Sequence, residues 1–76
     1  MPYETYRGHA IIASAIFDEA SSEWRPVASV GWRGATDARR QVQILSDWPE
    51  RFVSADDALG FAITRAQLWV DSRLRS

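Results

Sequence analysis

Residues 52–74 read FVSADDALGFAITRAQLWVDSRL, and no other segment of this chain has so clear a helical pattern. Ser54 is a good N-cap, because its hydroxyl can accept a hydrogen bond from a free backbone N–H of the first turn. Asp56 and Asp57 put negative charge at the positive end of the helix dipole, where acids stabilise a helix. The pattern therefore predicts one long helix that is capped at Ser54, and it gives this acidic pair a structural role.

The apolar residues of this predicted helix gather in one broad stripe when they are placed at helical spacing. The stripe consists of Ala58, Leu59, Ala62, Ile63, Ala66, Trp69, Val70 and Leu74. Because several members are alanine, another layer can approach the helix closely, and a sheet fits that need. Phe61 and Leu68 fall on the opposite side of the helix, near Gly60, and form a smaller apolar face.

Three segments upstream have the β-branched and aromatic content of strands. They are Tyr6–Phe17, Trp24–Arg33 and Arg40–Leu45, joined by a polar turn at 18–23 and a loop at 34–39, with residues 1–5 as a loose lead-in. Hairpin connections of this kind make a sheet antiparallel. The predicted fold is α+β: a three-stranded antiparallel sheet packed against one long C-terminal helix, in the order β-β-β-α.

Length and composition agree with a single domain over residues 1–76. The chain is 46% hydrophobic and has four Trp, which is enough apolar material for a core without disulfides. It contains no Cys, so thiolate chemistry is excluded. The net charge is -1 and all nine basic residues are Arg, so no bulk attraction to nucleic acid is implied.

Alternation along the strands predicts which side chains the helix covers. We expect Val42 and Ile44 to point inward, together with Trp32 and Trp69. The uncovered sheet face is expected to carry the polar residues Arg7, His9, Arg25, Arg33, Gln41 and Gln43, with the apolar residues Ile11, Phe17 and Val27 between them.

Apolar residues outside the predicted core indicate a partner, because small monomers seldom expose contiguous apolar patches. Two-fold self-association is the commonest way to cover such patches, so a homodimer is expected, with another protein as a further possibility. The candidate partner-binding residues are Ile11, Phe17 and Val27 on the sheet, Phe61 and Leu68 on the helix, and Trp48 in the preceding loop. For Trp48 the alternative is packing beneath the start of the helix.

Nucleic-acid binding through the sheet face is the alternative function. Arginines interleaved with an aromatic side chain are typical of platforms for single strands, and the candidates are Arg7, Arg25 and Arg33. The sequence pI of about 5.7 and the absence of Lys count against this alternative.

Motifs of catalysis are absent from the sequence. His9 is the only histidine, and no Ser, Cys or carboxylate lies at a local spacing that would make it a base or a ligand. No phosphate loop, dinucleotide fingerprint or zinc pattern occurs, and the acids of the 18–23 turn do not match a calcium loop. We expect no enzyme activity, cofactor or metal. Since neither a signal peptide nor a membrane-length apolar run is found, we expect a cytoplasmic protein without membrane contact.

Five short runs in the chain support a resemblance: GHAI at 8–11, DE at 18–19, WRP at 24–26, FVSADDA at 52–58 and AQLWVD at 66–71. They resemble a group of short proteobacterial proteins of unknown function with a β-β-β-α layout, near the double-stranded-RNA-binding-domain fold. The resemblance implies a fold and carries over no active residue.

The helix opening at 54–58 is also similar to that of HicB-type antitoxins, although their Gly-rich hairpin is missing. A true double-stranded-RNA-binding domain needs a first helix and a Lys cluster at the start of its last helix. This chain has two Asp at that position instead.

Overall fold

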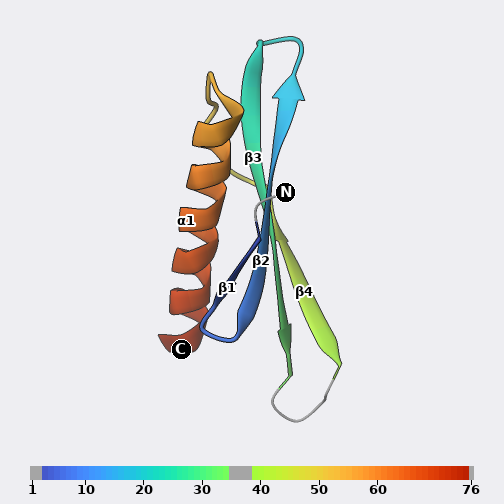
Figure 1. Cartoon of the computed structure of the whole chain (residues 1–76), viewed down its shortest axis with the longest axis vertical. Coiled ribbons are helices and arrows are strands. Elements are labelled where there is room, and N and C mark those ends of the chain that lie inside the picture. The colour runs from blue at the N-terminus through green and yellow to red at the C-terminus, as the bar shows by residue number, and fades with distance from the viewer. Residues whose placement is uncertain (1–2, 35–38, 76) are drawn as a thin grey trace.

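The computed structural model describes residues 3–34 and 39–75 of the chain. Its elements follow in the order β1 (Tyr3–Tyr6), β2 (His9–Asp18), β3 (Glu23–Arg33), β4 (Arg40–Leu45) and α1 (Ala55–Arg75). The strands form one antiparallel sheet in the order β1-β2-β3-β4. The helix lies across β2 and β3 on one side of the sheet, as Figure 1 shows. The predicted α+β class is confirmed, with one strand more than expected.

The additional strand is β1, which occupies the segment that was expected to be a loose lead-in. Arg7 and Gly8 have φ values of 48° and 78°, and two successive positive φ angles are characteristic of the type I′ hairpin turn. This turn folds β1 back onto β2, so that Tyr6 pairs with His9. The predicted continuous strand from Tyr6 is therefore two strands. Met1 and Pro2, also part of the expected lead-in, lie outside the described residues.

The connection between β2 and β3 is a tight hairpin, as the polar turn predicts. The backbone carbonyl of Asp18 accepts from Ser22 N–H at 2.8 Å, and its carboxylate accepts from Ala20 N–H at 3.0 Å. Ser22 has a positive φ of 58°. The predicted 34–39 loop is described only at its ends, since residues 35–38 lie outside the described part.

The core lies between α1 and the two central strands. Its fully buried members are Ile11 and Ala13 of β2, Ala28 and Val30 of β3, and Ala62, Ala66 and Val70 of α1. Alanines at the contact let the helix lie close to the sheet, because no long side chain separates the two layers. The predicted helical stripe is confirmed, although Leu74 at its end is exposed. Trp32 and Trp69 are partly buried at the edge of the core, with ring centroids 5.5 Å apart.

The start of α1 is capped as predicted. The backbone N–H of Asp57 donates to Ser54 Oγ at 3.1 Å, which satisfies one of the free donors of the first turn. Just upstream, Phe52 forms a two-way backbone bridge with Trp24 of β3. This bridge fixes where the helix begins relative to the sheet.

Candidate functional site

The face of the sheet away from α1 is not covered by any other described element. We call it the open face. The strand register shows its composition, because directly paired residues point to the same side. One row across all four strands reads Tyr3, Ile12, Ser29 and Ile44, and the next reads Thr5, Ala10, Gly31 and Val42. Ile16 and Val27 extend the apolar surface towards the β2–β3 hairpin.

His9 and Ile11, both predicted for the open face, lie on the opposite side of the sheet. Ile11 is 0% exposed and His9 is also buried, and both face α1. Their placement on the open face was wrong because β2 has apolar residues at both parities, so its pattern did not show which parity the helix covers. Of the three apolar residues assigned to this face, Val27 lies on it.

The orientation predicted for β4 is reversed. Val42 pairs with Gly31 and Ile44 pairs with Ser29. Both side chains therefore point to the open face, where each is 56% exposed. Gln41 and Gln43 point to the helix side of the sheet. They stay exposed because α1 packs on β2 and β3 and does not extend over β4.

Phe17 has the parity of Ile11 and lies beyond the start of the helix, at the hairpin end of β2. It is exposed on one side and packs its ring against Trp24 on the other, with centroids 5.1 Å apart. Phe17 therefore does not contribute to the open face, contrary to the sequence prediction.

The far side of the helix offers less apolar surface than predicted. Phe61 is covered by the segment that precedes the helix, since Phe52 and Trp48 contact its ring with centroid distances of 5.2 and 5.6 Å. Trp48 thus packs beneath the start of the helix, the alternative given above. Leu68 alone of the predicted helix-face pair stays open to solvent, at 51% exposure.

Positive charge is placed at the two ends of the open face. Arg25 lies near the β2–β3 hairpin, opposite Ile16, whereas Arg33 and Arg40 pair directly across β3 and β4 at the other end. Arg7 is not part of this face. Its guanidinium Nη1 donates to Asp71 Oδ1 of α1 at 2.7 Å, so this candidate nucleic-acid residue is engaged in an ion pair on the helix side.

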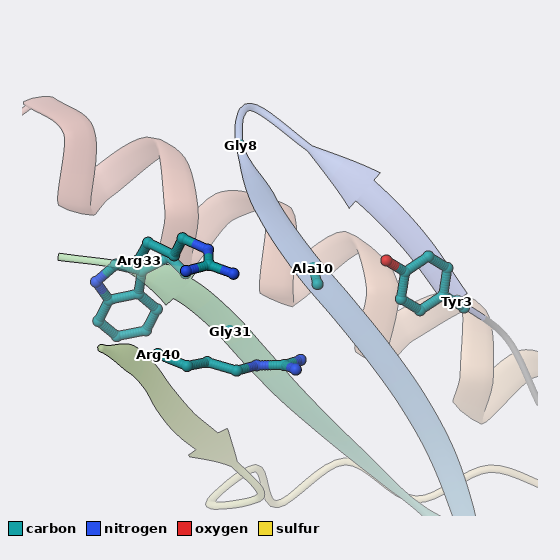
Figure 2. Close-up of a pocket in the computed structure, with 7 residues that line it drawn as sticks. Tyr3, Gly8, Ala10, Gly31, Arg33 and Arg40 are labelled. Carbon is teal, nitrogen blue, oxygen red and sulfur yellow. The ribbon is translucent and has the colours of Figure 1, made fainter. Parts of the chain in front are cut away.

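A groove of about 400 Å³ lies at the Arg33/Arg40 end of the open face. The residues that line it are Tyr3, Gly8, Ala10, Gly31, Trp32, Arg33 and Arg40. Figure 2 shows Arg33 and Arg40 extending over the sheet towards Ala10, with Tyr3 on the other side of the groove. Of these residues, only Arg33 was predicted from the sequence to belong to a binding surface. Arg40 lies two residues before Val42, so the two side chains share one side of β4. Arg40 was missed because Val42 was predicted to point towards the helix.

Two titratable groups outside the open face have shifted pKa values. The hydrogen bond from Arg7, followed by that from Tyr6, lowers the pKa of the Asp71 carboxyl below 3.8. The same carboxylate raises the pKa of Tyr6 above 10.0, first by accepting its hydrogen bond. Both groups tie β1 to α1, which is a structural role.

Among the residues that the structure describes, His9 is the only buried polar one. Its Nδ1–H donates to the Arg7 carbonyl at 2.9 Å, and its ring packs on Trp32 with centroids 5.7 Å apart. Nε2 has no hydrogen-bond partner among the described residues. No carboxylate, hydroxyl or thiol of the described chain bonds to this imidazole, so its geometry gives no support to a base or nucleophile pair.

Within residues 3–34 and 39–75, no three His, Asp or Glu side chains gather as they would around a metal ion. The described part also contains no helix long and apolar enough to cross a membrane. No protein-family model, curated protein or solved structure matches the chain. A functional assignment therefore depends on the geometry of the open face.

Proposed function

We propose that this chain is a non-enzymatic interaction module that binds a second copy of itself through the open face of its sheet. The observation that carries the proposal is the apolar surface there. Tyr3, Ile16, Val42 and Ile44 are exposed, and Ile12 and Val27 are half-buried between them. Monomers seldom leave a contiguous apolar patch of this kind uncovered.

The size of the face supports a second copy as the occupant. The four strands have 4, 10, 11 and 6 residues, which at a rise of about 3.3 Å per residue and a spacing of about 4.8 Å between strands gives the sheet face an area of roughly 490 Å². A standard interface takes about 800 Å² from each partner, so this face supplies somewhat more than half of that area. A two-fold axis would present the same patch twice, which makes the match in length and width automatic.

The distribution of charge on the face also supports this proposal. Its centre carries Ile12, Val27, Ser29 and Ile44, and the arginines lie at the two ends. Protein interfaces are depleted of charged residues at their centre and polar at their rim. The open face has this arrangement without any rearrangement of the strands.

Light scattering over a range of protein concentrations tests the proposal. The unmodified chain should show a dimer mass, and Ile44→Glu should shift it to a monomer, because a charge would be buried at the centre of the interface. Leu68→Glu is the matched control, since Leu68 is similarly exposed but lies on the helix. A monomer mass at every concentration would overturn the proposal, as would a dimer that Leu68→Glu splits and Ile44→Glu does not.

A nucleic-acid-binding module on the same face is the second candidate. Its support is that Arg25 and Arg33 share the open face with the exposed aromatic ring of Tyr3. Filter binding with single- and double-stranded oligonucleotides at two salt concentrations tests it, because phosphate contacts make affinity fall as salt rises. Absence of binding at low salt removes this candidate.

A further inference from the structure

Strand β4 forms one edge of the sheet, and no described segment pairs with its outer side (Figure 1). The strand pairs with β3 without a bulge, from Arg33 opposite Arg40 to Ala28 opposite Leu45. Natural sheets often protect such an edge with Pro, Lys or a bulge, because its free backbone groups can otherwise pair with another chain. β4 has none of these features, and Arg40 is its only charged residue. The edge is therefore open to a further strand.

The backbone groups that point outward from this edge belong to Arg40, Val42 and Ile44. Gly34 N–H donates to the Arg39 carbonyl at 3.4 Å, so the odd-numbered residues of β4 bond to β3. Alternate residues of an edge strand point their N–H and C=O groups away from its partner. In agreement, the side-chain amide of Gln43 reaches the Ile44 carbonyl at 3.2 Å. These groups lie in the plane of the sheet, so a contact on the open face does not use them.

A second β4 strand matches this edge when the two strands run antiparallel about a two-fold axis at Val42. Val42 then pairs with Val42 of the second copy, and Arg40 pairs with its Ile44. All three residues with outward backbone groups take part, and because each such pair exchanges two hydrogen bonds the edge would gain about six. An axis at Gln41 or at Gln43 would leave one of the three residues without a partner in β4.

The side chains of β4 fit this register on both sides of the sheet. On the open-face side each Arg40 lies opposite an isoleucine, so the register avoids the destabilising contact of like charges on directly paired residues. On the other side Gln41 lies opposite Gln43 of the second copy, and the two side-chain amides can hydrogen-bond to each other. Both glutamines are exposed, because α1 packs on β2 and β3 and leaves this side of β4 uncovered.

We infer that β4 is a second surface for self-association, at which β4 of one copy pairs antiparallel with β4 of another about an axis at Val42. A dimer that forms through the open face keeps its two β4 edges accessible, so edge pairing would join dimers into larger assemblies. It adds hydrogen bonds and little apolar area, so it requires a higher protein concentration than the open-face dimer does. The inference goes beyond the proposed function and does not rest on it.

Disulfide trapping tests the pairing, and the absence of Cys from the chain gives a clean background. Gln41→Cys and Gln43→Cys place thiols on the side of the sheet that the open-face contact does not use. In a mixture of the two variants, the Cα atoms of positions 41 and 43 would lie about 4.5 Å apart across the edge, within the range that a disulfide spans. Between two copies of the same variant the distance would be about 8 Å, which is too long.

Oxidation of the mixture, with one variant labelled with ¹⁵N, should therefore give mixed dimers at least about tenfold faster than either variant gives dimers alone. The two pure variants are the matched controls, because they carry the same thiol at the same edge. Equal rates in all three samples would indicate random collision and overturn the inference. A pure variant that links faster than the mixture would place the axis elsewhere and would also overturn it.

A proline substitution tests whether the backbone of β4 makes the contact. Arg40 is the first residue of β4 and its N–H points away from β3, so proline is tolerated there. Arg40→Pro, added to both thiol variants, should slow the mixed cross-link at least about fivefold, because each copy loses one hydrogen bond at the edge. Arg40→Ala removes the same charge but keeps the N–H, so it should leave the rate unchanged. Equal effects of the two substitutions would contradict strand pairing.

The edge contact and the open-face contact fail separately. The mixed cross-link should still form when both thiol variants also carry Ile44→Glu, even where that substitution abolishes the open-face dimer. Loss of the cross-link in this background would show that the open-face contact had brought the thiols together, and would overturn the inference. Absence of any mixed cross-link in the original background would overturn it as well, and would leave the edge to an extended segment of another protein.

Discussion

The hydroxyl of Tyr6 donates to the carboxylate of Asp71 and lies 3.0 Å from each of its oxygens. The two residues are 65 positions apart in the sequence, so this contact ties the first strand to the last turns of the helix. Arg7 in the adjoining turn bonds to the same carboxylate, and Gln67 of the helix donates to Glu4 of β1. Side chains as well as the strand ladder therefore hold β1 at the edge of the sheet.

The Asp71 contacts predict an acid-sensitive contribution to stability. The pKa of Asp71 is lower in the folded chain than its ordinary value of 3.8, so its contribution is fully present above that value. It is lost as the pH falls through the lowered pKa of the folded state. Asp71→Asn should make the free energy of unfolding smaller at neutral pH and less dependent on pH in the acid range, as measured by urea denaturation. An unchanged acid dependence would show that these contacts do not stabilise the fold.

Trp69→Ala should destabilise the fold by about 2–4 kcal/mol, somewhat less than the ~3–5 kcal/mol typical of a fully buried large aromatic. The reduction follows from its position, since Trp69 is partly buried and packs on Trp32 at the margin of the core. Leu68→Ala, one residue away on the exposed side, should change stability by no more than about 0.5 kcal/mol. Chemical denaturation of both variants tests whether Trp69 faces the core and Leu68 faces solvent. Equal losses of stability in the two variants would contradict this orientation of the helix.

The helix was predictable from the sequence because its signals are local. Ser54 bonds within its own first turn, and the stripe from Ala58 to Val70 needs only the helical repeat to gather on one side. The antiparallel hairpin after β2 was predictable for the same reason, since its polar residues lie next to one another in the chain.

The β1–β2 hairpin was not predictable, because its turn contains Arg7 at a position where glycine or asparagine is usual. Gly8 alone gave too weak a signal to divide the strand. The contacts that hold β1, from Tyr6 and Arg7 to Asp71, join distant parts of the sequence and leave no local pattern.

The composition of the open face was only partly predictable, because alternation shows which residues share a side and not which side the helix covers. Val42 and Ile44 were correctly grouped, but their register against Gly31 and Ser29 places them on the open face. Arg40 was missed with them. The family resemblance stays a prediction, since it concerns a group defined by layout more than by a functional motif.

Gly60→Ala should raise stability by about 1 kcal/mol, the usual difference between these residues in an exposed helix interior. Gly60 lies within α1 on its solvent side, and a Cβ at this position would meet no atom within 4 Å. The gain is expected because glycine loses more backbone entropy than alanine when the helix forms. Urea denaturation measures the gain in stability, and light scattering measures the mass of the same variant in solution. A stabilised variant of unchanged mass agrees with an interface on the open face, whereas loss of the dimer would indicate that a second copy packs closely at Gly60 and would contradict that interface.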